Sequence, residues 1–293
     1  MSDQNAPLPA EPKPATPAMA STAPPFRDLA AVRAEIDRID DALHDLLMQR
    51  ADLVAHMAAS RLKNGAPTFR PGREALILRR LLQRNRGALA RPALVRFWRE
   101  MIAASLAQQG NFTVAIPAET GEDSCARLAR AHFGVLTPLK LHSTPFRALA
   151  AVAGGESAVA ILPPPEDAER PDPAWWMQME APRLRVVAAL PFLAAPDASP
   201  QGYAIATLAP EPTGRDRSLI RIEPGADHSR PRIAALLTAA GLPPRWLIRR
   251  ESPLPMALAE VPGFLAEDDS RLAALPFPRL TILGTYAEPE PEA

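Results

Sequence analysis

The residues of this chain that could do chemistry are arginines on predicted helices, accompanied by one carboxylate, one hydroxyl and one amide. The set is Arg33, Arg50, Arg61, Arg73, Glu74, Ser105 and Gln109. Arg50 and Arg61 are 11 residues apart, close to three helical turns, so they project from the same face of a helix. Arg33 points about 100° away from Arg50, so one helix cannot easily bring both to one ligand. In an antiparallel dimer, Arg33 could instead reach the site of the partner chain.

Guanidinium groups suit carboxylate ligands, because their planar fork of N–H groups matches the two oxygens. Ser105 and Gln109 are four residues apart and so share one face of a helix. The set therefore offers many donors for carboxylate groups and no nucleophile–base pair. The alternative is that these arginines are solvated side chains on an amphipathic helical bundle.

One long helix must position the first three arginines. No Pro or Gly occurs from residue 26 to 64, and the apolar residues there are spaced three and four apart in one stripe. At ~1.5 Å per residue the helix reaches roughly 50 Å, which indicates coiled-coil-like pairing with another chain. Asn64 to Pro67 is a stop signal, and shorter helices are predicted at Pro71–Arg84 and Pro92–Gln109. Because three helices of unequal length cannot enclose the long one, we expect a homodimer to complete the bundle.

Composition excludes several classes of function. The 293 residues have a formal net charge of zero, which gives no global argument for nucleic acid or an anionic membrane surface. The single cysteine, Cys125, excludes an intrachain disulfide and a cysteine-based metal site. No apolar run is long enough for a membrane span. Residues 1–25 are rich in Pro, Ala and Ser and lack the features of a signal peptide, so a disordered tail and a cytoplasmic location are expected.

Beyond residue 110 the pattern changes to alternating strands and helices. Strands are predicted at 112–116, 158–162, 186–190 and 203–207, and helices at 124–132 and 145–153. This alternation predicts an α/β region with a mixed sheet at residues 111–210. Residues 211–287 follow a strand, helix, strand, strand, helix, strand order, which is ferredoxin-like. Trp175 and Trp176 are expected to serve packing, with ligand stacking as the alternative, and residues 288–293 form a frayed acidic end.

The helical segment resembles a known family. Its motifs are Arg33-x2-Ile36-x3-Asp40-x2-Leu43-x3-Leu47-x2-Arg50-x2-Leu53-Val54, then Arg61, Arg73-Glu74 and Ile102-x2-Ser105-x3-Gln109. These motifs resemble the all-helical, intertwined-dimer (type II) chorismate mutases over about 80 residues. The resemblance implies a helical mutase domain at residues 26–110 that binds chorismate and prephenate, forms a homodimer and needs no cofactor or metal.

The resemblance also implies a role for each polar residue. The residue at the Arg33 position enters from the other subunit and, with Arg50, binds the substrate carboxylates. The position of Arg61 is usually a Lys that contacts the ether oxygen and a carboxylate, so Arg61 is a departure from the family. Glu74 matches a carboxylate that accepts the substrate hydroxyl, and Arg73 neighbours it.

The comparison with the family also covers the third predicted helix and the residue just before the second predicted helix. Ser105 matches a hydroxyl that contacts a carboxylate, and Gln109 matches the amide donor to the ether oxygen. A second departure is Arg70, which stands where the family often has an Asp that contacts the substrate hydroxyl.

Residues 111–210 are similar to the first lobe of prephenate dehydratases, and the remainder resembles their ACT regulatory domain. Pro163–Asp167 stands where dehydratases have a Pro-Ile-Glu-Asn stretch, but their Thr-Arg-Phe motif has no counterpart, and most of the second lobe is missing before Tyr203. Dehydration is therefore not expected. Arg250–Pro253 and Gly284–Tyr286 echo ACT motifs, while the glycine-led motif at the first helix is absent, so a structural or dimerising role is favoured over phenylalanine sensing.

Three functions follow from these observations. The first is a monofunctional chorismate mutase with a degenerate dehydratase-like extension. The second is a bifunctional chorismate mutase/prephenate dehydratase. The third is a regulatory or scaffold protein whose mutase site is spoiled by Arg61 and Arg70 and which binds another enzyme of the aromatic pathway.

Overall fold

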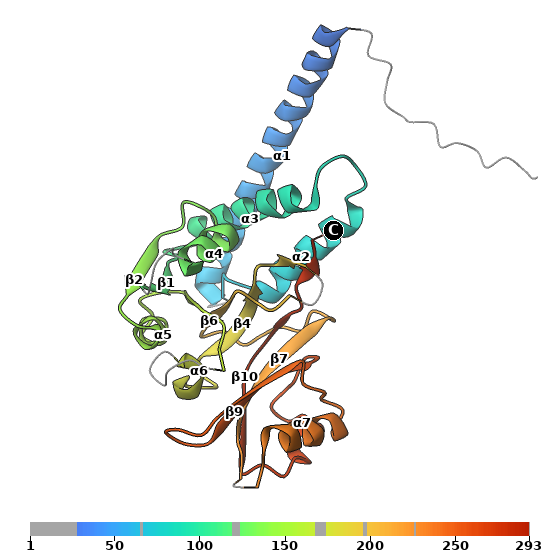
Figure 1. The fold of residues 1–293 in the computed structure, drawn as a ribbon. Coiled ribbons are helices and arrows are strands. Elements are labelled where there is room, and N and C mark those ends of the chain that lie inside the picture. The colour runs from blue at the N-terminus through green and yellow to red at the C-terminus, as the bar shows by residue number, and fades with distance from the viewer. Residues whose placement is uncertain are drawn as a thin grey trace, which may run out of the picture. The chain divides into compact units, whose positions relative to one another are not determined.

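A computed structural model describes residues 28–64, 67–118, 124–167, 174–195, 198–225 and 227–292, with the side chains of 61–64 excepted (Figure 1). The predicted tail at 1–25 lies outside the described residues. The chain divides into two compact units, residues 1–50 and 51–293. In its described part the first unit is a single helical segment that ends at Arg50, and the rest of that helix and all other elements belong to the second unit.

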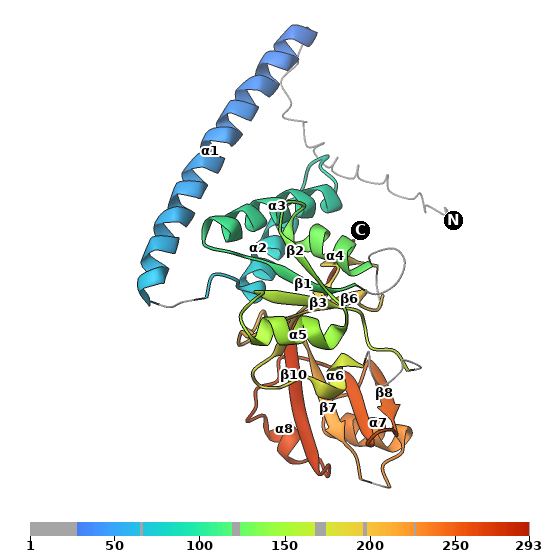
Figure 2. The ribbon, with the colours of Figure 1, turned by 90° about the vertical axis from the view of Figure 1, so that its left-hand side faces the viewer.

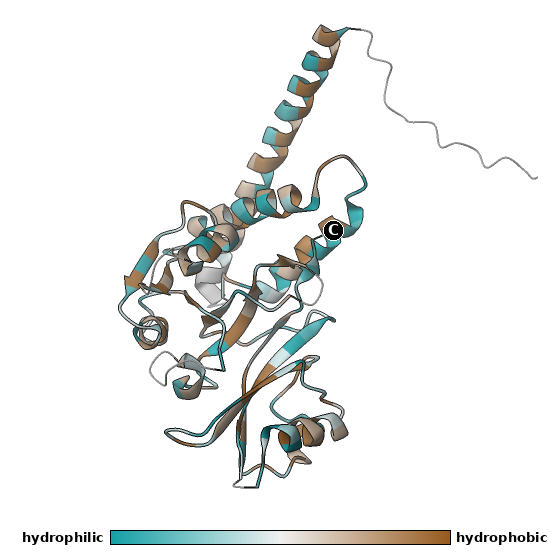
Figure 3. Cartoon of the chain, in the orientation of Figure 1, coloured by the Kyte–Doolittle hydropathy of each residue, from teal (hydrophilic) through white to brown (hydrophobic). Residues whose placement is uncertain are grey.

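The three N-terminal helices agree with the sequence prediction to within a few residues. Helix α1 spans Leu29–Asn64, α2 spans Pro71–Arg84 and α3 spans Arg91–Gln108. Pro71 occupies the first turn of α2, where its missing N–H costs nothing. Hydrophobic and hydrophilic residues alternate in bands along α1 (Figure 3). Among the helices of the described residues, none is both long and apolar enough to cross a membrane.

The described part of the second unit contains one nine-stranded mixed sheet in the order β2-β1-β3-β6-β4-β10-β7-β9-β8. Its strands are β1 Val114–Pro117, β2 Leu139–His142, β3 Val159–Leu162, β4 Arg185–Leu190, β6 Gly202–Ala206, β7 Asp216–Glu223, β8 Trp246–Arg250, β9 Met256–Pro262 and β10 Arg279–Ala287. Strands β1, β2 and β3 are parallel, and β6 runs antiparallel to both β3 and β4. Short strands β5 Leu193–Ala194 and β11 Glu290–Pro291 form a separate pair. The predicted frayed end at 288–293 is therefore wrong for Glu290 and Pro291, because Glu290 is 8% exposed and its segment pairs with β5. The predicted α/β architecture is confirmed.

Helices cover both faces of the first half of this sheet, so its central strands β1, β3 and β6 are buried on both sides. Strand β3 places Ala160 and Leu162 in one core cluster and Val159 and Ile161 in another, as the two-residue period of a strand requires. Helices α5 Pro145–Ala153 and α6 Trp175–Gln178 cover the first face, and α3 with α4 Ser124–Phe133 covers the second (Figure 2). The two tryptophans of α6 are at most 2% exposed, so they belong to the core.

The C-terminal elements have the predicted strand, helix, strand, strand, helix, strand order. Helices α7 Arg230–Ala239 and α8 Ser270–Ala273 lie between β7 and β8 and between β9 and β10. Strand β10 pairs with β4 at Gly284 and Val186 and so continues the first half of the sheet. Gly284 has φ +159°, and a Cβ there would clash with the Val186 carbonyl oxygen, so this close approach requires glycine. The boundary at 210/211 remains a prediction, since one sheet runs through both regions.

Two tyrosines and a carboxylate meet inside this sheet. The Tyr286 hydroxyl donates to the Glu260 Oε1 at 2.5 Å, and Arg217 Nη1 donates to Oε2 at 3.4 Å. The Tyr203 and Tyr286 ring centroids are 5.6 Å apart. Burial raises the pKa of both phenols above the ordinary value, and the charge of Glu260 raises it further.

We expect neither tyrosine to ionise while the protein is folded. Their pKa values are higher in the folded than in the unfolded chain, so the stability they contribute is present below the unfolded value of about 10 and is lost as the pH rises above it. Since the chain has two tyrosines in all, alkaline absorbance titration reads this pair alone. Tyrosinate absorbance should appear together with unfolding by circular dichroism. Gradual ionisation near pH 10 with an intact fold would contradict the network.

Candidate active site

Glu74 and Arg99 form a buried ion pair between α2 and α3. The Arg99 Nη1 donates to the Glu74 Oε2 at 3.0 Å. Arg99 is 4% exposed and Glu74 is 7% exposed. Burial raises the pKa of Glu74, and Arg99 opposes that shift. The Arg99 guanidinium also lies 5.3 Å from the centroid of the Phe192 ring. Glu74, a residue predicted from the sequence, is therefore held in one orientation by a partner that the prediction did not include.

A signal for Arg99 is present in the sequence. Val95, Ile102 and Leu106 are buried residues of α3, and Arg99 falls between them at the same helical spacing. A charge within an apolar stripe needs a partner of opposite sign, because an unpaired buried charge is costly. The buried Glu74 on α2 supplies that partner.

Ser105 and Gln109 share a face of α3, as their spacing predicted. The Gln109 Nε2 donates to the Ser105 carbonyl oxygen at 2.9 Å, and the Ser105 hydroxyl donates to the Met101 carbonyl oxygen at 2.8 Å. The Gln109 Oε1 is buried and has no hydrogen-bond partner among the described residues. Gln109 lines a cavity of about 350 Å³ together with Phe69 and Leu106. Glu74 is not among the described residues that line this cavity.

The remaining predicted residues are placed less completely. Arg73 is exposed on α2. Arg33 is exposed and Arg50 half-buried on α1 in the first unit, and burial lowers the pKa of Arg50. The side chain of Arg61 lies outside the described residues. Convergence of all seven residues on one ligand therefore stays a prediction.

Arg70 has a partner of its own within the second unit. Its Nη2 and Nε donate to the Glu211 Oε1 at 2.6 and 3.0 Å. This arginine stands where a carboxylate was expected from the family resemblance. The contact to Glu211 accounts for its charge without a ligand.

Helix α2, which carries Glu74, is anchored on the C-terminal strands by Arg79. The Arg79 Nε donates to the Glu290 Oε1 at 2.6 Å and its Nη1 to the Thr213 hydroxyl at 2.8 Å. Its Nη2 donates to the carbonyl oxygens of Arg215 and Glu288 at 2.9 and 2.8 Å. The 7% exposed Arg79 thus connects the helix to two segments of the chain, residues 213–215 and 288–290.

The described residues contain no group of three or more His, Cys, Asp or Glu side chains that could hold a metal ion. The arrangement in the helices is instead one of guanidinium, carboxylate and amide groups. Such groups can bind and orient an anionic ligand, which stays a prediction for this chain.

Residues 32–110 match the family model described as chorismate mutase type II. This segment belongs to the type II chorismate mutases. It lies within the mutase domain predicted at 26–110 and contains all seven predicted site residues.

Relatives of the chain are proteins named bifunctional chorismate mutase/prephenate dehydratase. The Pseudomonas aeruginosa protein is 34% identical over 141 residues, which cover 45% of this chain and 38% of that protein. The Aquifex aeolicus protein is 35% identical over 94 residues, 31% of this chain and 26% of that one. The Neisseria gonorrhoeae protein is 35% identical over 102 residues, 35% and 27% of the two chains. The chain thus spans less than two fifths of the length of these relatives.

Two solved structures resemble the chain at lower similarity. One is described as GqqA, a novel type of quorum quenching acylases, with 18% identity, a TM-score of 0.46 and coverage of 61% of this chain and 96% of that one. The other is the prephenate dehydratase of Arthrobacter aurescens in complex with L-Phe, with 14% identity, a TM-score of 0.44 and coverage of 60% and 90%. At TM-scores below 0.5 these likenesses fix neither the fold nor the function of the α/β region.

Proposed function

We propose that this chain is a chorismate mutase, which rearranges chorismate to prephenate in aromatic amino-acid biosynthesis, in the cytoplasm. The observation that carries the proposal is the family match at residues 32–110, because this segment contains every residue expected to form the site. The rearrangement needs no nucleophile and no cofactor. The enzyme holds the substrate in its reactive conformer and stabilises the negative charge that develops on the ether oxygen.

Each residue has a proposed role in this reaction. Arg50 and the partner subunit's Arg33 bind the substrate carboxylates, with Arg73 and Ser105 as further contacts. Arg61 and Gln109 donate to the ether oxygen, where negative charge increases in the transition state. Glu74 accepts the hydroxyl of the substrate.

The Glu74–Arg99 pair supports the last of these roles. Arg99 binds the Glu74 Oε2, so the carboxylate is held by one oxygen and has its Oε1 for a ligand hydroxyl. Burial raises the pKa of Glu74, and Arg99 opposes that shift, so the pair favours the ionised acceptor relative to an unpaired carboxylate at the same place. A positioned carboxylate of this kind does not need Arg70, which is occupied by Glu211.

A chorismate turnover assay tests the proposal directly. Chorismate absorbance should fall when the pure full chain is added, and prephenate should accumulate. A chain that leaves chorismate unchanged would contradict the proposal and would favour the scaffold hypothesis.

A homodimer is part of the proposed function. In its described part the first unit is one helical segment, so within that unit no second element covers its apolar residues. Ile36, Ile39, Leu43 and Leu46 are each at least 45% exposed. Apolar stripes of this length are typical of helices that pair with another chain, and the same pairing would carry Arg33 into the partner's site.

We expect Leu43→Glu to separate the dimer and to remove mutase activity, because it places a charge in the apolar stripe. Light scattering should change from twice 31.6 kDa to 31.6 kDa. Ala34→Glu is the matched control, since Ala34 lies about 180° round α1 from Leu43. An Ala34→Glu chain that also dissociates, or an active Leu43→Glu monomer, would contradict the dimer.

The names of the relatives favour one second function, the bifunctional mutase/dehydratase. We propose instead that residues 111–210 are a degenerate dehydratase-like region and that 211–287 are an ACT-like domain. An assay for phenylpyruvate from prephenate separates the two hypotheses. Robust product formation would support the bifunctional enzyme and overturn our proposal for this region.

A further inference from the structure

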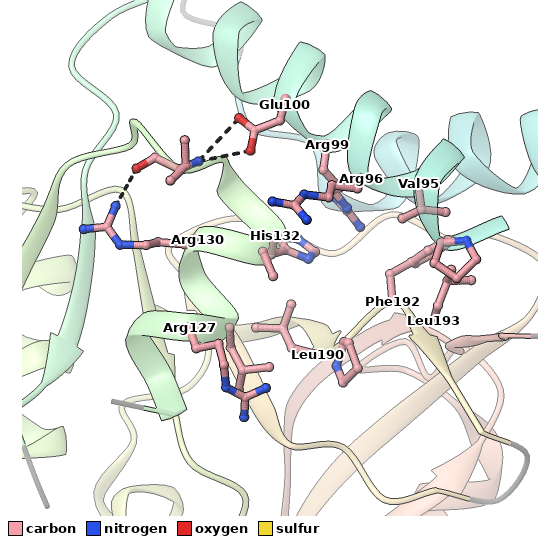
Figure 4. A pocket seen from close by; sticks show the side chains of 15 residues that line it. Val95, Arg96, Arg99, Glu100, Arg127, Arg130, His132, Leu190, Phe192 and Leu193 are labelled. Atoms are coloured by element: carbon pink, nitrogen blue, oxygen red, sulfur yellow. Dashed lines mark hydrogen bonds between the residues drawn. The ribbon is translucent and has the colours of Figure 1, made fainter. Parts of the chain in front are cut away.

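A second cavity, of about 620 Å³, lies between α3, α4 and the turn after β4 (Figure 4). Its apolar wall includes Val95 of α3, Leu128 of α4, and Leu190 and Phe192 at the end of β4. Those four side chains are at most 8% exposed, so this wall belongs to the packed interior. The volume is in the range of about 300–1,000 Å³ that is usual for sites of small organic ligands.

The lining of the cavity is also cationic. Arg96 and Arg99 of α3 and Arg127 and Arg130 of α4 line it, with Glu100 as the lining carboxylate. Counting Glu74, which is bonded to Arg99, four guanidiniums are balanced by two carboxylates, a surplus of two positive charges.

Two of the charged groups at the rim are already engaged with the same backbone. Glu100 accepts from the Val135 N–H at 3.2 Å, and the Arg130 Nη1 donates to the Val135 carbonyl oxygen at 2.5 Å. Figure 4 shows both contacts on one side of the cavity. This leaves Arg96 and Arg127 as exposed cations at the mouth and Arg99 as the buried cation inside.

His132 contributes a buried polar atom that lacks a partner. The residue is 6% exposed, and its Nε2 has no hydrogen bond within the described part of the chain. Burial and the charge of Arg99 hold the pKa of His132 well below its usual value, so the ring is neutral near pH 7. A neutral imidazole can carry its proton on Nε2 and donate it. Because an unsatisfied buried polar group is costly, a ligand that accepts this hydrogen bond gains affinity.

Arg96, Arg99 and His132 extend into the same space, with Phe192 facing them (Figure 4). Among the described residues, the Arg99 guanidinium donates to Glu74 through Nη1. The other N–H groups of Arg99 can therefore bind a second anion. The cavity thus combines anion donors with an apolar surface in one lining.

We propose that this cavity is a binding site for an organic carboxylate with an apolar body. The carboxylate lies between the Arg99 guanidinium and the His132 Nε2, with Arg96 at the mouth, and the apolar body packs on Leu190 and Phe192. Neither His132 nor Arg96 belongs to the proposed mutase site. The binding site stands whether or not the chain turns over chorismate.

The test uses the full chain and 3-phenylpropanoate as the probe, with binding measured by calorimetry and by ligand-observed NMR. We expect a Kd of about 1 mM or tighter, and weaker binding by about tenfold or more for the neutral 3-phenylpropanamide. Inorganic phosphate should bind more weakly than the probe, because it makes no use of the apolar wall. No binding of the probe at about 10 mM, or equal binding of the amide or of phosphate, would overturn the proposal.

Variants locate the site. Arg96→Gln and His132→Phe should each weaken binding of 3-phenylpropanoate about fivefold or more, while Arg147→Gln, at an exposed position on α5, should leave it unchanged. Arg96 is exposed, so we expect the Arg96→Gln chain to fold. This variant therefore tests the site even if His132→Phe does not fold. Equal affinities of the Arg96→Gln and Arg147→Gln chains would show that the probe binds elsewhere.

Discussion

Replacing Arg50 or Gln109 by Ala is expected to reduce chorismate turnover at least about 100-fold, while the dimer stays intact. The loss of one well-placed donor to developing or fixed negative charge typically costs about 10²–10³ in rate. Arg50 is proposed to bind a substrate carboxylate, and Gln109 is proposed to donate to the ether oxygen. The measurement is the steady-state rate of chorismate consumption, with light scattering to confirm the oligomeric state.

Arg38→Ala is the control for Arg50→Ala, because Arg38 is an exposed arginine of the same helix whose contact is an ion pair with Glu35 at 2.6 Å. Exposed pairs of this kind contribute little, so this variant should keep its activity. Near-normal turnover in Arg50→Ala or Gln109→Ala would remove these residues from the site. Equal losses in Arg38→Ala and Arg50→Ala would point to damage of the helix rather than of a binding contact.

The helices could be predicted closely because their signals are local. Pro71 sets the start of α2, and Asn64 to Pro67 sets the end of α1, as found. These residues act on the backbone of their own turn, so neither tertiary packing nor a partner is needed to interpret them. Local motifs in these helices also indicated the type II chorismate mutase family, and the family match at residues 32–110 confirms that resemblance.

Contacts between distant segments were not predicted. Strand β2, Leu139–His142, was missed because it is an edge strand that is only partly buried and has Lys140 and His142 among its four residues. The pairing of Gly284 with Val186 joins segments almost 100 residues apart, and no local motif encodes it. Both depend on which strands the fold places side by side.

The candidate site divides in the same way. The i, i+4 relation of Ser105 and Gln109 follows from helical geometry alone and is present. The pairing of Glu74 with Arg99 depends on how α2 packs on α3, so the sequence indicated a buried charge on each helix but not their contact. The expected meeting of Arg33, Arg50 and Arg61 depends on a second chain and remains a prediction.

Replacing Arg79 by Ala is expected to lower the free energy of unfolding by about 3–5 kcal/mol. The substitution removes the bonds to Glu290, Thr213, Arg215 and Glu288, and it leaves the 8% exposed Glu290 with less compensation for its buried charge. Glu290 keeps its ion pair with Arg215, so much of the loss comes from the Thr213 hydroxyl and the two backbone carbonyl oxygens that lose the Arg79 donors. For a unit of this size the midpoint of thermal unfolding should fall by roughly 10 °C.

Arg80→Ala provides the matched comparison, because Arg80 is the next residue of α2 and its side chain is exposed. Exposed substitutions of this type usually change stability by less than about 0.5 kcal/mol. Denaturant unfolding of the two variants therefore separates the effect of the Arg79 contacts from the effect of removing any arginine from the helix. If Arg79→Ala were as stable as Arg80→Ala, the C-terminal strands would not anchor α2, and the position of Glu74 would have to depend on Arg99 and the apolar contacts of α2 alone.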